Sequence, residues 1–136
     1  MLHSLADIVI SIVPNLLCTA FGAFLTLFIN HFTDFLKNRR ERRSTRSLFL
    51  YSIKDYRRFA NKSLPILPQL EWKNKTWEYS QFLVLKYYPK EYETFSSIRL
   101  LEPFIDSIPY PGGGETVDAV KLNAAIDDLI STVSNN

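Results

Sequence analysis

Cysteine, histidine and glycine are all scarce in this chain. The single cysteine, Cys18, has no intrachain partner for a disulfide and cannot form a cysteine-based metal site. The two histidines, His3 and His31, lie at opposite ends of one apolar segment, too far apart to act together in catalysis. The glycine run at 112–114 lacks the Lys and Ser/Thr of a phosphate-binding loop. We therefore expect no enzyme activity, no metal and no cofactor.

Charged side chains are almost absent from the first 35 residues, where only Asp7 and Asp34 are charged. Residues 8–29 read IVISIVPNLLCTAFGAFLTLFI, and a helix of 22 residues spans about 33 Å, enough to cross a bilayer once. A cleaved signal peptide needs basic residues before its apolar run, and a core helix of a soluble protein seldom stays uncharged for so long. We therefore expect a transmembrane helix over about 5–33, within an anchor at 1–35.

Basic residues are concentrated directly after this apolar segment. Residues 36–62 hold ten basic and two acidic side chains, whereas 63–136 hold six basic and ten acidic ones. The positive-inside rule then places the N-terminus outside and the C-terminal two-thirds in the cytoplasm. The basic residues nearest the membrane exit are expected to contact anionic lipid. They are Lys37, Arg39, Arg40, Arg42, Arg43 and Arg46. This location accounts for the basic run, so we expect no nucleic acid partner.

A polar and small-residue face runs along the apolar helix. Its members follow one another at steps of three or four, which keeps them on one side of a helix: Ser11, Asn15, Thr19, Gly22, Thr26 and Asn30. Three interpretations are open. The side chains are merely tolerated and bond to their own backbone, or the face packs against another helix, or several copies line a pore. We favour packing between copies, and hence a homo-oligomer.

Residues 36–62 contain no proline or glycine, so we expect the membrane helix to continue through them as a basic juxtamembrane helix. Phe49, Ile53, Tyr56 and Ala60 recur at steps of 4, 3 and 4 and form an apolar stripe on this helix. Two prolines in the following segment, SLPILPQL, predict its end.

The last part of the chain, 63–136, predicts a helical cytoplasmic domain. Thr76 is expected to cap a helix that ends before Pro89, although FLVLKYY within it also has strand character. A further helix is expected over about 90–107, where Pro103 kinks or ends it. The whole chain is therefore predicted to be an all-α membrane protein: one membrane helix, continuous with a cytoplasmic helix, and a small helical bundle.

A linker at 109–115, PYPGGGE, separates the final helix, which Thr116 is expected to cap and which runs to about Thr132. Its apolar face holds Leu122, Ile126, Leu129 and Val133. Its acidic residues and the basic residues of 36–62 favour packing of the two helices, although exposed ion pairs contribute only about 0 to 1 kcal/mol each.

Aromatic side chains are crowded between residues 72 and 95. Five of them are candidates for docking a cytosolic protein partner: Trp72, Trp77, Tyr79, Tyr87 and Tyr88. Packing in the core is the interpretation that we favour for the aromatic group as a whole, with partner docking as the second interpretation.

The predicted layout resembles that of many small bacterial membrane proteins, including membrane-acting effectors of toxin and phage-defence systems. This resemblance implies a bacterial inner membrane as the expected location. The leading hypothesis is a non-enzymatic single-pass effector that self-associates through its membrane helix and perturbs the bilayer. The alternative is a membrane-anchored adaptor or accessory subunit that tethers a cytosolic partner.

Overall fold

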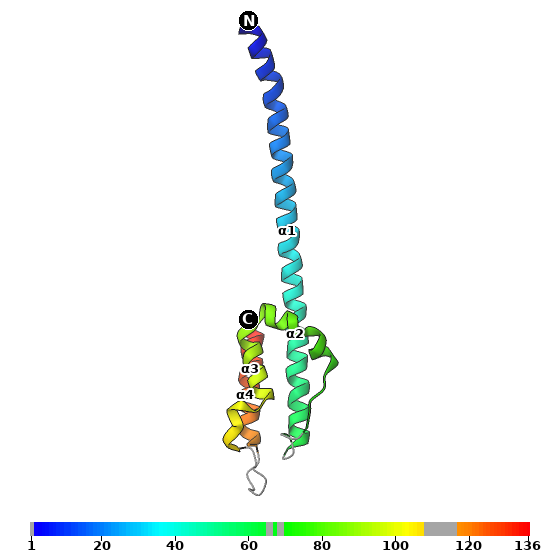
Figure 1. Ribbon diagram of the computed structural model, residues 1–136, viewed down its shortest axis with the longest axis vertical. Coiled ribbons are helices and arrows are strands. Elements are labelled where there is room, and N and C mark those ends of the chain that lie inside the picture. Colours follow the sequence, from blue (N-terminus) through cyan, green and yellow to red (C-terminus); the bar gives the residue numbers. More distant parts are fainter. Residues whose placement is uncertain (1, 65–66, 68–69, 108–116) are drawn as a thin grey trace. The chain divides into compact units, whose positions relative to one another are not determined.

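The computed structural model describes residues 2–64, 67, 70–107 and 117–136, and all regular structure in these ranges is helical. In chain order the elements are α1 (Leu2–Ser63), α2 (Lys75–Tyr87), α3 (Pro89–Arg99), the 3-10 helix η2 (Glu102–Ser107) and α4 (Ala119–Asn135) (Figure 1). The all-α prediction is therefore confirmed, and the segment with strand character lies mostly within α2. The chain forms two compact units, Met1–Arg40 and Glu41–Asn136.

The first unit consists of the N-terminal part of α1. Among the described residues, α1 is the one helix long and apolar enough to be a candidate membrane span, and the most apolar part of it is not buried at all. Its large side chains, such as Ile10 and Leu27, both 70% exposed, have no core to enter. Pro14 lies inside the helix, which continues past it despite the missing backbone donor.

The second unit has its own core, to which every helix contributes. The predicted stripe of α1 is buried there, with Phe49, Ile53 and Ala60 at 0% exposure. The predicted face of α4 is buried as well, from Leu122 to Val133. The two helices are also joined at the surface, where the Arg57 guanidinium pairs with the Asp127 carboxylate. Hydrophobic periodicity therefore predicted correctly which sides of these two helices face inward.

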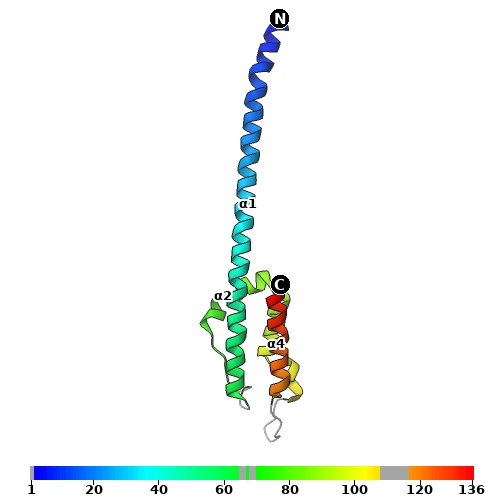
Figure 2. The same ribbon diagram turned by 180° about the vertical axis from the view of Figure 1, so that it is seen from behind.

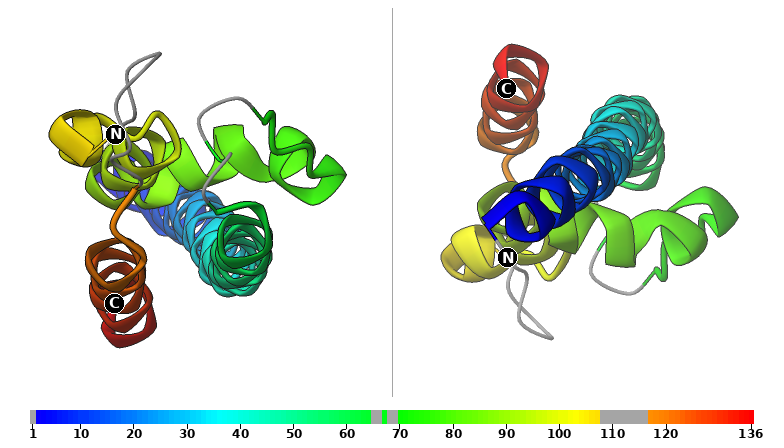
Figure 3. Two further views of the ribbon diagram at one scale, coloured as in Figure 1. Left: turned by 90° about the horizontal axis from the view of Figure 1, so that it is seen from below. Right: turned by 90° about the horizontal axis from the view of Figure 1, so that it is seen from above.

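Within the second unit, α3 and α4 run beside the C-terminal part of α1, as views from opposite sides show (Figures 1 and 2). Seen from below and from above, α2 lies across the other helices of the unit (Figure 3). The end of α2 is held at the beginning of the unit, because the Tyr87 hydroxyl donates to Glu41 Oε2 at 2.7 Å. This crossing carries the chain from α1 to α3, and Trp77 near the start of α2 is buried in the core.

The helix starts differ from those predicted. Asn74 caps α2, accepting from the Trp77 backbone N–H at 2.9 Å, so the prediction of Thr76 as its cap was wrong by two residues. Asp118 caps α4 by accepting from the N–H groups of Val120 and Lys121. The predicted cap Thr116 and the predicted linker 109–115 lie outside the described residues.

The helix predicted over about 90–107 ends early. α3 stops at Arg99, and Leu101 then takes a left-handed backbone conformation with φ of 58°. Glycine is the usual residue at such a helix end, because a side chain strains this conformation. The Leu101 side chain is only 5% exposed, so its burial offsets the strain. The change of direction therefore occurs before Pro103, which lies within η2.

Candidate functional sites

The polar face of α1, defined by the six residues from Ser11 to Asn30, is wholly exposed in the structure. Several of its side chains bond back to the helix: Asn15 Nδ2 donates to the Ser11 carbonyl at 3.2 Å, and the Thr19 and Thr26 hydroxyls donate to carbonyls four residues earlier. These bonds are those expected of polar residues tolerated in a membrane helix. Within the described chain, no such bond is made by the Ser11 or Asn30 side chain, and nothing lies within 4 Å of a Cβ built on Gly22.

The six basic residues predicted to contact lipid are mostly solvent-exposed. Only Arg46 is half-buried. The Arg42 guanidinium lies 5.6 Å from the centre of the Tyr88 ring, a cation–π contact that joins α1 to the end of α2. Lys37, Arg39, Arg40 and Arg43 are exposed to solvent. Lipid contact itself stays a prediction.

The five aromatic residues proposed for docking separate into two groups. Trp72, Trp77 and Tyr88 are at most 8% exposed and belong to the core, so the core-packing alternative describes these three. Tyr87 is half-buried and bonded to Glu41. Tyr79, in contrast, is 82% exposed. Phe82, which the sequence did not single out, is 75% exposed on the same side of α2. The exposed aromatic face of α2 therefore consists of Tyr79 and Phe82.

Asp55 on α1 fixes the segment that precedes α2. Its Oδ2 accepts from Trp72 Nε1 at 3.0 Å and from Asn74 Nδ2 at 2.7 Å. Two donors on one carboxylate oxygen hold the indole ring and the α2 cap to the same point of α1. The result is a fixed orientation of Trp72, whose ring then forms one wall of a pocket.

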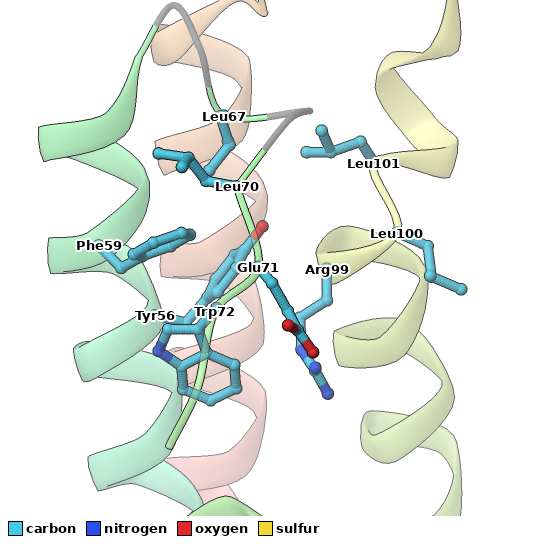
Figure 4. A pocket seen from close by; sticks show the side chains of 9 residues that line it. All are labelled: Tyr56, Phe59, Leu67, Leu70, Glu71, Trp72, Arg99, Leu100 and Leu101. Atoms are coloured by element: carbon cyan, nitrogen blue, oxygen red, sulfur yellow. The ribbon is translucent and has the colours of Figure 1, made fainter.

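This pocket, here called the Arg99 pocket, lies between α1, the segment before α2 and the end of α3 (Figure 4). Its volume is about 350 Å³. The nine lining residues are Tyr56, Phe59, Leu67, Leu70, Glu71, Trp72, Arg99, Leu100 and Leu101. Seven of these nine side chains are apolar or aromatic, and one guanidinium lies among them, a combination found in small-molecule sites.

Burial changes the acid–base properties of two groups at the Arg99 pocket. It raises the pKa of the Tyr56 hydroxyl to about 12, while the positive charge of Arg99 works in the opposite direction. Burial also lowers the pKa of the Arg99 guanidinium from its usual value. Tyr56 is 2% exposed and donates a long hydrogen bond of 3.4 Å to the Ile98 carbonyl. The Tyr56 hydroxyl therefore keeps its proton at neutral pH, and Arg99 keeps its charge because a guanidinium is not deprotonated in proteins.

The described residues contain no group of three or more His, Cys, Asp or Glu side chains able to hold a metal ion. The Arg99 pocket, with a half-buried guanidinium among apolar side chains, is the candidate ligand site. Comparison of the chain with protein-family models gives no match, and neither do comparisons with curated proteins and with solved structures. Function must therefore be argued from the residues themselves.

Proposed function

We propose that this chain is a non-enzymatic, single-pass membrane effector. In this proposal α1 crosses a bacterial inner membrane with its N-terminus outside and its C-terminus in the cytoplasm. Copies of the chain self-associate through the polar face of α1, and the assembly perturbs the bilayer. The length and apolar surface of α1 support the membrane location, and the basic residues that follow support the orientation.

The observation that carries the proposal is the exposed polar face of α1, on which Gly22 has open space beside it and the Asn30 side chain has no hydrogen bond to another described residue. Gly22 has empty space around it, so no contact within the described chain requires a glycine there. Close packing of a second helix does require one, because small residues allow two backbones to approach. The Asn30 amide likewise has no bonding partner among the described residues, and an amide within or near hydrocarbon needs one. A second copy supplies both.

The test replaces Asn15 and Gly22 together by leucine in the full-length chain. We expect the oligomer formed in detergent to shift to monomer, because the double variant loses both an interhelical amide and the close approach of two backbones. Cross-linking in membranes, followed by size analysis in detergent, measures this shift. We also expect induced expression of the unchanged chain to depolarise cells, as measured with a potential-sensitive dye, and the double variant to lose this effect.

The matched control replaces Phe24 and Phe28, on the opposite side of α1, by leucine. Both are exposed, and the change keeps that side apolar, so association and depolarisation should stay at the level of the unchanged chain. Association that persists in the Asn15/Gly22 variant would contradict the interface. If the unchanged chain leaves the membrane potential intact, the effector role itself is wrong.

A second candidate, a membrane-anchored adaptor, is favoured by the exposed aromatic face of α2. Tyr79 and Phe82 are large side chains left outside the core, and exposed aromatics are typical anchors of protein interfaces. Replacing both by serine is expected to weaken capture of a cytosolic partner at least about tenfold, since such anchors contribute about 2 kcal/mol or more each. Pull-down with the full-length chain measures capture.

The control for this test is Val120→Ser on α4, because Val120 is also apolar and 78% exposed. A stoichiometric partner retained by the control and lost by the Tyr79/Phe82 variant, without membrane depolarisation, supports the adaptor. Equal capture by both variants would count against docking at α2.

A further inference from the structure

We propose that the Arg99 pocket binds a small anionic molecule: a carboxylate or phosphate group attached to an apolar or aromatic body. The anionic group binds the Arg99 guanidinium, and the body occupies the apolar part of the pocket. This inference concerns the second unit alone and does not depend on the membrane role of α1.

The Arg99 guanidinium is positioned by aromatic rings rather than by a carboxylate. Its central carbon lies 4.9 Å from the centre of the Trp72 ring, 5.6 Å from that of Trp77 and 6.0 Å from that of Phe95. Among the described residues, no Asp or Glu oxygen lies within 4.0 Å of it. Rings bind the flat face of a guanidinium, whereas its N–H groups point outward along the edge. An oxyanion is therefore the complementary group for this edge.

Partial burial strengthens the attraction of the Arg99 guanidinium for an anionic ligand. Arg99 is half-buried and has lost part of its hydration, so its charge lies in a medium of lower dielectric than water. A fully solvated arginine gains little from an added anion, because water screens the pair. A half-buried guanidinium with fixed geometry gains more, since two parallel hydrogen bonds to one oxyanion form without reorganisation.

The walls of the pocket favour an apolar body on the ligand. Phe59, Leu67 and Leu70 lie on one side and Leu100 and Leu101 on the other, as Figure 4 shows. The volume of about 350 Å³ is at the lower end of the range for small-molecule sites, which suits a ligand with one ring or a short chain.

Glu71 is the one acidic residue that lines the pocket, and its charge opposes an incoming anion. Its side chain is 79% exposed, however, and one of its oxygens lies 3.3 Å from Lys73 Nζ. Solvent and this lysine therefore screen Glu71 much more than Arg99 is screened. The electrostatic potential near the Arg99 guanidinium therefore stays positive.

Two features keep the pocket organised without a ligand. Asp55 fixes the Trp72 ring through the indole N–H. The left-handed turn at Leu101 directs the chain away from α3 directly after Arg99, at the cost of a strained backbone. Strain of this kind is common beside ligand sites, where the surrounding structure maintains it.

The chain offers a direct readout, because its two tryptophans both contact Arg99. The full-length chain in non-ionic detergent is titrated with phenylacetate, phenyl phosphate, inorganic phosphate and the neutral phenylacetamide while tryptophan fluorescence is recorded. We expect a saturable change with phenylacetate or phenyl phosphate. Phenylacetamide and inorganic phosphate should bind at least tenfold more weakly, since each lacks one half of the ligand. The stronger of the two charged aromatic probes identifies the head group.

Three variants locate the binding. Arg99→Gln should weaken binding of the better probe at least tenfold, whereas Arg58→Gln, an exposed arginine outside the pocket, should not change it. Leu70→Glu is the second test, because Leu70 is 45% exposed and tolerates substitution, yet the new carboxylate competes for Arg99. Equal affinity for acid and amide, unchanged binding by Leu70→Glu, equal loss in Arg58→Gln, or no saturable change at millimolar probe would overturn the proposal.

Discussion

Replacing Phe95 by alanine is expected to lower the free energy of unfolding of the second unit by about 3 to 5 kcal/mol. The Phe95 side chain is 0% exposed, and its ring centre lies 4.9 Å from that of Trp77 and 5.7 Å from that of Phe49. It also meets Tyr56 and Trp72 edge to face. Truncation therefore creates a cavity and removes several aromatic pairs, each of which contributes about 0.5 to 1.5 kcal/mol beyond burial.

Urea unfolding of the full-length chain in mild detergent, followed by tryptophan fluorescence, measures this loss, because both tryptophans lie in the second unit. The matched control is Phe82→Ala, which truncates the same side chain at a position that is 75% exposed. It should change stability by no more than about 0.5 kcal/mol. Similar losses for the two variants would show that Phe95 is not at the centre of the core.

Stability of the second unit should also fall as the pH rises from about 10 to about 12, through Tyr56. Burial raises the pKa of Tyr56 to about 12 in the folded chain, whereas the ordinary pKa of a tyrosine hydroxyl is 10.0. Between these two values the unfolded chain releases the proton and the folded chain retains it, so rising pH favours unfolding. The Tyr56 contribution is fully present below pH 10, and its loss by pH 12 amounts to roughly 2 to 3 kcal/mol.

Urea unfolding at several pH values from 9 to 12 tests this pH dependence. Tyr56→Phe removes the ionising group, so its stability should decline less steeply over that range than the stability of the unchanged chain. Tyr51→Phe serves as the control, because Tyr51 is on the same helix but 56% exposed, and it should retain the original slope. An equally steep decline in the Tyr56→Phe variant would show that another group is responsible.

The parts of the fold that the sequence predicted are those governed by a single helix. Apolar residues spaced by three and four predicted the buried sides of α1 and α4, because a regular helix fixes the direction of every side chain. The end of α1 at Ser63 likewise followed from the prolines after it. Neither prediction needs knowledge of what the helix packs against.

Features that depend on distant residues were missed. Asn74 and Thr76 are both good capping residues, but only Asn74 also bonds to Asp55, which lies 19 positions earlier in the chain. Arg99 gave no signal in the sequence, since two of its three aromatic neighbours, Trp72 and Trp77, lie outside its own helix. The early end of α3 was missed because it depends on burial of Leu101 rather than on a glycine. The α2 cap, the surroundings of Arg99 and the end of α3 are determined by tertiary packing.

The threonines of α1 have a consequence for how an assembly would be controlled. Thr19, Thr26 and Thr33 each donate to a carbonyl of their own helix, at 2.8 to 2.9 Å. A solitary helix therefore leaves none of these hydroxyl protons without an acceptor, and a dispersed copy is not destabilised by them. If copies do associate, dispersed and assembled populations can coexist, and mass action sets their ratio. If α1 spans a membrane as proposed, the density of the protein in that membrane becomes the variable that a cell can adjust.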